Sequence, residues 1–198
     1  MARHNGISVE HSHLITATPS CVLDAFFDSR ALATWWHTTQ SVTVPEPLGV
    51  YAVEWEPTVY HDELLGQLGG SFHGTVMEYR PGFEFFVADA YWLPPQGNPL
   101  GPMALEVTCT VEGPATRVTV RQSGLENGSR WKKYFSLIDR GWLSALQALS
   151  TYIEKSSVLD TAYGDPYIAS PESKKKTMLR IPKPKSAVAK SRRLKKSS

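Results

Sequence analysis

Cysteine is scarce in this sequence, and long apolar runs are missing from it. The two cysteines, Cys21 and Cys109, lie far apart, with no further cysteine or histidine at metal-ligand spacing. We therefore expect no disulfide framework, no metal site and no cofactor. No stretch approaches the roughly 18 apolar residues of a membrane-spanning helix, and the N-terminus, MARHNGISVEHSH, lacks the apolar core of a signal peptide. These absences predict a soluble, cytoplasmic protein without a transmembrane segment.

Recognised catalytic motifs are also lacking. The sequence contains no nucleophile elbow, no Ser/His/Asp order and no glycine-rich phosphate loop, and it shows no internal repeat. Any catalysis would therefore depend on isolated acid or base side chains inside a pocket.

Charge is present but unevenly distributed. Residues 172–198 contain 11 Lys or Arg and one acidic residue, whereas the preceding 171 residues contain 10 basic and 18 acidic ones. The basic segment is rich in Lys, Ser, Ala and Pro and poor in apolar residues, so it cannot bury enough surface to offset its ordering entropy. We predict a folded domain over residues 1–170 and a disordered basic tail over 171–198.

Two short helices are predicted early in the chain, between Thr18 and Trp36. Thr18 is a suitable N-cap, and Pro19 is tolerated at the first helical position. Asp28 or Ser29 can cap the second helix, which ends at two adjacent tryptophans.

Strand-like segments surround and follow this unit. Alternating apolar and polar residues or β-branched runs predict seven strands: 7–17, 41–44, 49–56, 72–79, 84–92, 104–112 and 116–123. We expect irregular loops over 61–70, which is rich in glycine, and over 93–102, which contains four prolines. In the segment 104–112 one face is expected to be apolar, formed by Leu105, Val107, Cys109 and Val111.

One long helix is predicted over Arg130–Lys155. Apolar residues recur there at spacings of three and four and form a single stripe: Trp131, Phe135, Ile138, Trp142, Leu146, Leu149 and Ile153. The whole order of elements predicts an α+β domain with a seven-stranded antiparallel sheet.

The order and spacing of several residues resemble the START-like (SRPBCC) helix-grip superfamily, and within it the family named after activators of the heat-shock chaperone ATPase. The residues that carry the resemblance are Thr18-Pro19, Trp35-Trp36, Gly49, Tyr51, Gly74, Pro81, Trp92, Thr116, Gly124 and Gly141-Trp142. The resemblance covers about residues 7–155. It implies a curved sheet wrapped around the long C-terminal helix, often with an apolar cavity between them. It does not imply chaperone activation, which in the family depends on a separate N-terminal domain for which we expect no room ahead of Gly6.

The resemblance implies a site for a hydrophobic or aromatic small molecule, such as a lipid-like ligand, between the sheet and the helix. Aromatic side chains at the inner faces suit such a site. The expected ligand-binding residues are Trp35, Trp36, Tyr51, Trp55, Phe72, Phe86, Tyr91, Trp92, Phe135, Ile138 and Trp142.

An enzyme of the polyketide cyclase or dehydratase kind is an alternative, with His37, His73 and Tyr91 as candidate pocket groups. Glu54 and Asp89 have strand parity opposite to Trp55 and Trp92, so we expect both acids to face solvent if the tryptophans line the cavity.

Two further features allow more than one interpretation. His11 and His13 share a strand face, but two ligands fall short of a metal site, so we interpret them as solvent-facing. The basic segment 172–198 favours weak, salt-sensitive contact with nucleic acid or another anionic surface, which would make the protein an adaptor.

Overall fold

The computed structural model describes residues 7–162, with side chains up to residue 156. A seven-stranded sheet dominates it, and every neighbouring pair of strands is antiparallel. In spatial order the strands are β1 (Ile7–Ile15), β9 (Ala115–Leu125), β8 (Leu100–Glu112), β7 (Glu84–Leu93), β6 (Gly70–Arg80), β3 (Val50–Trp55) and β2 (Gln40–Thr43). The predicted α+β helix-grip architecture is confirmed.

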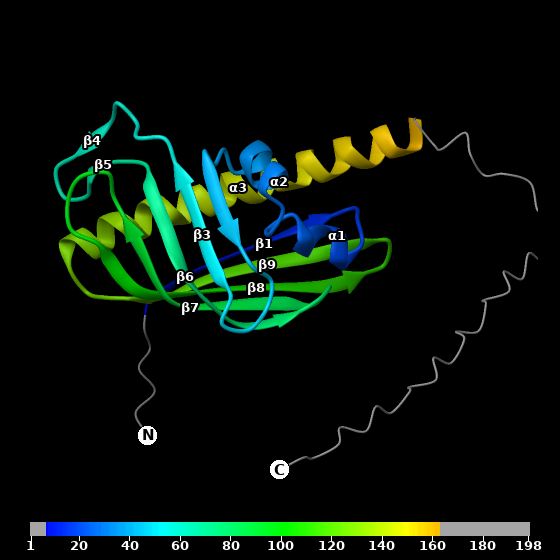
Figure 1. Ribbon diagram of the computed structural model, residues 1–198, viewed down its shortest axis with the longest axis horizontal. Helices are drawn as coiled ribbons and strands as arrows, with labels where there is room; N and C mark the ends of the chain where they lie inside the picture. The colour runs from blue at the N-terminus through cyan, green and yellow to red at the C-terminus, as the bar shows by residue number, and fades with distance from the viewer. Residues whose placement is uncertain (1–6, 163–198) are drawn as a thin grey trace, which may run out of the picture. The chain divides into compact units, whose positions relative to one another are not determined.

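Three helices accompany the sheet within the described residues: α1 (Pro19–Asp24), α2 (Ser29–Trp35) and α3 (Ser129–Ala162). Figure 1 shows α3 running along one face of the curved sheet, and it packs against β1 and α2. The core between helix and sheet includes Trp142, Leu146, Leu149 and Ile153 of the predicted stripe, all at most 5% exposed. The sequence predicts that the helix ends at Lys155, but it continues to Ala162. The apolar stripe shows which part of α3 is covered by the sheet, and a helix can extend beyond its covered part.

The two short helices begin where the sequence predicts. The Thr18 hydroxyl accepts a hydrogen bond from the Cys21 amide, and Pro19 occupies the first turn of α1. The Asp28 carboxylate, rather than Ser29, caps α2 by accepting from the Ala31 amide at 2.7 Å. Both caps satisfy amides that have no partner inside their helices.

Two expected loops contain regular structure. Within 61–70 a small two-stranded ladder joins β4 (His61–Asp62) to β5 (Gly66–Gln67). The prediction of loop up to residue 102 is also wrong, because β8 starts at Leu100 and includes Pro102. The β7–β8 ladder pairs Trp92 with Leu100 and Ala90 with Met103, and its register shifts between these two pairs. Pro102 lies at this shift and is not paired with β7, so its missing N–H removes no hydrogen bond from the ladder.

The expected apolar face of the segment 104–112 is buried except at its end. Leu105, Val107 and Cys109 are buried as expected, whereas Val111 is 65% exposed because it lies near the end of β8, past the covered part of the sheet. Cys21 and Cys109 are not joined by a disulfide, and burial raises the pKa of Cys109 to about 12. The predicted tail, and with it the boundary at 170/171, lies outside the described residues and stays a prediction.

Candidate functional site

A cavity of about 340 Å³ lies between the inner face of the sheet and α3. Six of its fourteen lining residues are aromatic: Trp36, Trp55, Phe72, Trp92, Tyr134 and Trp142. Leu68, Leu137 and Ile138 add aliphatic surface, and Glu56, Thr58, Gly69, Gln122 and Gly141 complete the lining. Most of this surface offers dispersion contacts and no hydrogen bonds, which is typical of sites for apolar ligands.

Trp36 is the centre of the aromatic wall. It follows the last residue of α2, and its ring lies 5.0 Å from that of Trp142 and 5.1 Å from that of Trp55, measured between centroids. The Trp55 indole N–H donates to the Trp36 carbonyl at 2.9 Å, and the Trp92 indole N–H donates to the Gly69 carbonyl at 2.9 Å. These indole donors are bonded to the protein, so the tryptophans present apolar ring surface to the cavity.

Hydrogen bonds join a small set of buried side chains, centred on Gln122, in the wall of the cavity. Gln122 of β9 is 3% exposed, and its Oε1 accepts from the Trp142 indole N–H at 3.0 Å. Its Nε2 donates to the Tyr134 hydroxyl at 3.2 Å and faces Met103 Sδ at 3.1 Å. This group ties β9 and β8 to α3 across the cavity.

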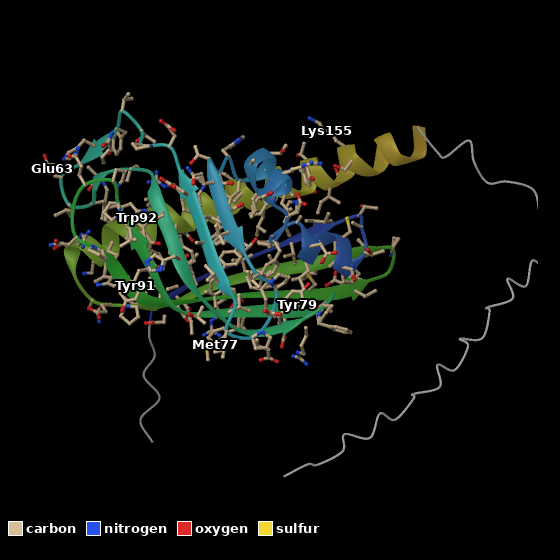
Figure 2. The ribbon with its side chains drawn as sticks, in the orientation of Figure 1. Glu63, Met77, Tyr79, Tyr91, Trp92 and Lys155 are labelled. Atoms are coloured by element: carbon tan, nitrogen blue, oxygen red, sulfur yellow. The ribbon has the colours of Figure 1, made fainter. Side chains whose placement is uncertain are left out.

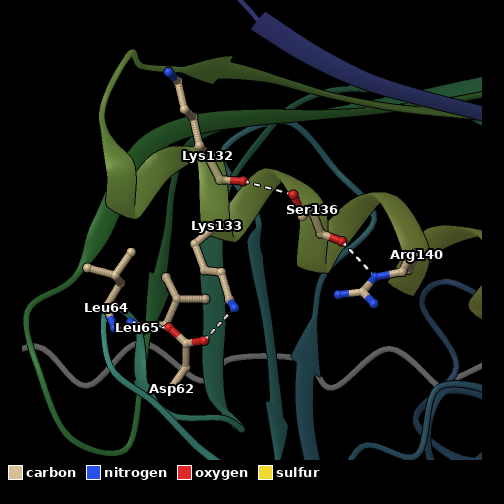
Figure 3. A network of polar contacts seen from close by, with 7 residues as sticks. All are labelled: Asp62, Leu64, Leu65, Lys132, Lys133, Ser136 and Arg140. Atoms are coloured by element: carbon tan, nitrogen blue, oxygen red, sulfur yellow. Dashed lines mark hydrogen bonds and ion pairs between the residues drawn. The ribbon is translucent and has the colours of Figure 1, made fainter.

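The segment Glu56–Gly69, which carries β4 and β5, forms one rim of the cavity and is fastened to α3. The Asp62 carboxylate is 6% exposed and lies 2.8 Å from Lys133 Nζ, while its other oxygen accepts from the backbone amides of Leu64 and Leu65 (Figure 3). The hydrogen bond from Lys133, helped by that from Leu64, lowers the pKa of Asp62, and the same carboxylate raises the pKa of Lys133. A charged contact therefore holds this rim against the helix at neutral pH.

Six of the eleven expected ligand-binding residues are brought together in the wall of this cavity. They come from the residue that follows α2, from three strands and from α3: Trp36, Trp55, Phe72, Trp92, Ile138 and Trp142. Helical spacing placed Ile138 and Trp142 on one stripe of α3, whereas the sequence left open which face the strand tryptophans occupy. The fold brings both sets together around one space.

The other five do not line it. Trp35, the last residue of α2, and Tyr51 of β3 are packed in the core. The Trp35 ring contacts Phe26, and the Tyr51 ring contacts Phe27 and Phe85. Phe135 borders a separate hollow with Ile7, Leu125 and Trp131.

Phe86 and Tyr91 lie on the outer face of the sheet. Phe85 and Val87 are buried on the inner face, whereas beyond a β-bulge between Val87 and Ala90 the buried residues are Ala90 and Trp92. The bulge shifts the alternation of side chains by one residue, so Phe86 and Tyr91 both lie on the outer face although they differ in parity. Figure 2 labels Tyr91 and its neighbour Trp92 on β7. The Tyr91 ring lies over Gly101, where an added Cβ would meet it at 2.5 Å, and it also stacks near His73. Tyr91 therefore covers a glycine in the neighbouring strand and does not face the cavity.

The candidate catalytic groups do not converge in the cavity. His37 is exposed at the end of α2, and His73 stacks on Tyr91 on the outer face, with ring centroids 6.0 Å apart. Glu54 and Asp89 are exposed, as their strand parity predicts. None of these five side chains is among the residues that line the cavity.

The solvent-facing interpretation is wrong for His11, because its Nε2 lies 2.9 Å from Asp139 Oδ1 on α3 and the side chain is 22% exposed. Within residues 7–156, no group of three His, Cys, Asp or Glu side chains is arranged to hold a metal ion. None of the helices in the described part of the chain is long and apolar enough to cross a membrane.

Gln122 and Tyr134 are the functional candidates that sequence reasoning missed, although both carried a signal. Gln122 continues the inward phase of Val118 and Val120, so a polar side chain is expected on the buried face. Tyr134 lies three residues after Trp131 and four before Ile138, on the apolar stripe of α3. A polar group in phase with core residues marks a buried hydrogen-bond network or a ligand contact.

Comparisons with known proteins agree with this architecture. Solved structures with the same fold include protein MLL2253 from Mesorhizobium loti (14% identity, 76% of this chain and 98% of that one, TM-score 0.59). The Aha1 dimer from Colwellia psychrerythraea is similar (14% identity, 75% and 96%, TM-score 0.56), as is protein CV1439 from Chromobacterium violaceum (19% identity, 74% and 96%, TM-score 0.55). The comparison with curated protein sequences finds no match.

The family model described as activator of Hsp90 ATPase homolog 1-like protein matches residues 16–154, which is more than half of the chain. The match spans the helices α1 and α2, all strands after β1, and most of α3. The chain therefore belongs to the family of activator of Hsp90 ATPase homolog 1-like proteins.

Proposed function

We propose that this protein binds a hydrophobic or aromatic small molecule, without chemical conversion, in the cavity between the sheet and α3. The observation that carries the proposal is the cavity itself, about 340 Å³ in volume and walled by four tryptophans whose rings come from separate elements. Burial of apolar ligand surface against such a wall is favourable by roughly 25 cal/mol per Å².

The size and lining of the cavity limit the ligand. Small-molecule sites range from about 300 to 1,000 Å³, so this cavity suits one compact molecule and is too small for a two-chain lipid. The side chains considered for acid–base chemistry, His37, His73 and Tyr91, are not in its lining, which favours binding over turnover.

The test is to mix the purified full chain with a panel of aromatic metabolites and single-chain lipids and to follow tryptophan fluorescence and retention in native mass spectrometry. Four of the six tryptophans line the cavity, so an occupant should change the emission. We expect saturable binding of compact aromatic members. Failure of every member to bind would contradict the proposal.

A matched pair of variants assigns the binding to the cavity. Gly141 lines it, and a Cβ added there meets nothing within 4 Å, so Gly141→Leu adds bulk inside the cavity without a clash at the backbone. Ser144→Leu adds the same side chain to an exposed position of α3 outside the cavity. We expect Gly141→Leu to weaken binding severalfold or more and Ser144→Leu to leave it unchanged, and equal effects would place the ligand elsewhere.

A further inference from the structure

The orientation of the Gln122 side-chain amide is fixed by its neighbour on α3. An indole N–H can only donate, so the Trp142 N–H at 3.0 Å must meet the amide oxygen of Gln122 and not its nitrogen. The amide nitrogen then points to the Tyr134 hydroxyl at 3.2 Å and to Met103 Sδ at 3.1 Å. Both ends of this buried amide are therefore occupied by protein groups.

This orientation decides the role of the Tyr134 hydroxyl. Because Gln122 Nε2 is a donor, the Tyr134 oxygen accepts that bond, and its own hydrogen remains to be donated elsewhere. No hydrogen bond in the part of the chain with described side chains gives this O–H an acceptor. A buried donor without an acceptor is unfavourable, so an acceptor supplied by a ligand would be bound favourably at this O–H.

The Tyr134 ring is held firmly while it lines the cavity. It stacks on Trp92 with 5.3 Å between centroids and meets the edge of Trp131 at 6.1 Å. The side chain is 4% exposed, and burial raises the pKa of its hydroxyl, so the proton stays in place at neutral pH. The donor is thus oriented before any ligand arrives.

We propose that the cavity selects an uncharged aromatic ligand carrying one hydrogen-bond acceptor, of the aryl ketone class, whose carbonyl oxygen accepts from the Tyr134 hydroxyl. This rests on the proposed function and adds the chemical class of its ligand. Among the described residues that line the cavity, the only charged side chain is that of the exposed Glu56, so this lining offers no cation to pair with a carboxylate, and burial of an unpaired anion is costly.

The test compares three probes of nearly equal shape on the full-length protein: 2-acetylnaphthalene, 2-isopropenylnaphthalene, which replaces the carbonyl oxygen by a methylene group, and 2-naphthoate. By calorimetry we expect the ketone to bind about three- to tenfold more tightly than the alkene, the range that one net hydrogen bond supplies. The naphthoate should bind most weakly. Wild-type protein that binds ketone and alkene equally would overturn this inference while leaving the proposed function standing, whereas failure of all three probes would overturn both.

Two variants assign the preference to one hydroxyl. Tyr134→Phe should bring the ratio of ketone to alkene affinity close to one. Tyr51→Phe is the matched control, because it removes another buried hydroxyl that lies outside the cavity lining, and the ratio should stay at its wild-type value. A ketone preference that survives Tyr134→Phe unchanged would overturn the assignment.

An infrared measurement on the wild-type protein does not depend on how well the variants fold. The carbonyl stretch of bound 2-acetylnaphthalene should lie at lower frequency than in cyclohexane, where no donor is present. A bound ketone whose stretch matches that in cyclohexane would contradict the hydrogen bond directly.

Discussion

The indole rings of the adjacent residues Trp35 and Trp36 are stacked, with centroids 5.1 Å apart and planes 4° from parallel, yet only Trp36 lines the cavity. Trp35 is 2% exposed, and its N–H donates to the Ala25 carbonyl at 2.9 Å. The two tryptophans therefore form two layers: Trp36 contacts the cavity, and Trp35 packs behind it in the core.

This layering predicts different consequences for the two positions. Trp35→Ala should lower the free energy of unfolding by about 3–5 kcal/mol, because it removes a fully buried ring and leaves the Ala25 carbonyl without its donor. Trp36→Ala should cost less stability and weaken binding of 2-acetylnaphthalene more strongly. Urea unfolding and calorimetry on both variants measure the two effects. The layering is contradicted if Trp36→Ala binds the probe as well as wild type does.

Gly141 is expected to limit the stability of α3. It lies in the interior of the helix, and an added Cβ has open space around it. Gly141→Ala should raise the free energy of unfolding by up to about 1 kcal/mol, because glycine loses more backbone entropy in a helix than alanine does. Thermal unfolding monitored by circular dichroism measures the change, and a lower midpoint would show an unseen clash.

The contact between Asp62 and Lys133 should make stability depend on pH. The Asp62 carboxylate has a lowered pKa in the folded state. The contact therefore stabilises the fold fully above the ordinary pKa of aspartate, about 3.9, and this stabilisation is lost as the pH falls through the lowered value. Urea titrations from pH 7 to pH 2 should therefore show Lys133→Gln to be less stable than wild type at neutral pH, with the difference shrinking in acid.

Lys132 provides the control for that measurement. It is the preceding residue on α3, and its side chain points away from Asp62 (Figure 3). Lys132→Gln should leave the pH dependence as it is in wild type. If both lysine variants behave alike, the effect comes from net charge and not from the contact.

Tyr51 is expected to destabilise the core slightly and to make it sensitive to alkali. Its hydroxyl is buried without a partner, so Tyr51→Phe should raise the free energy of unfolding by about 1 kcal/mol. Burial raises the pKa of Tyr51, so above the ordinary tyrosine value of about 10 the unfolded chain ionises before the folded one and the free energy of unfolding falls. Unfolding curves at pH 8 and pH 11 should show a smaller alkaline loss in the variant, and an equal loss would argue against it.

Local signals were sufficient for most of the elements but not for two segments rich in glycine or proline. The caps at Thr18 and Asp28 and the stripe on α3 depend on residues close together in the chain, so the sequence alone locates these helices. The start of β8 depends on pairing with β7, which tolerates Pro102 at a ladder irregularity. The β4–β5 ladder is local, but its strands have only two residues each, too short to show an alternating pattern.

The amino-acid sequence by itself determined the order of the main elements and the apolar stripe of α3, because periodicity follows from local backbone geometry. Only the tertiary structure decided which aromatic rings share one space, since parity gives a face but not a position along it. It placed Trp36 in the cavity wall and Trp35 behind it, and it joined Gln122 of β9 to Trp142 and Tyr134 of α3. Hydrogen-bond direction in that group depends on contacts across the fold, which no local pattern encodes.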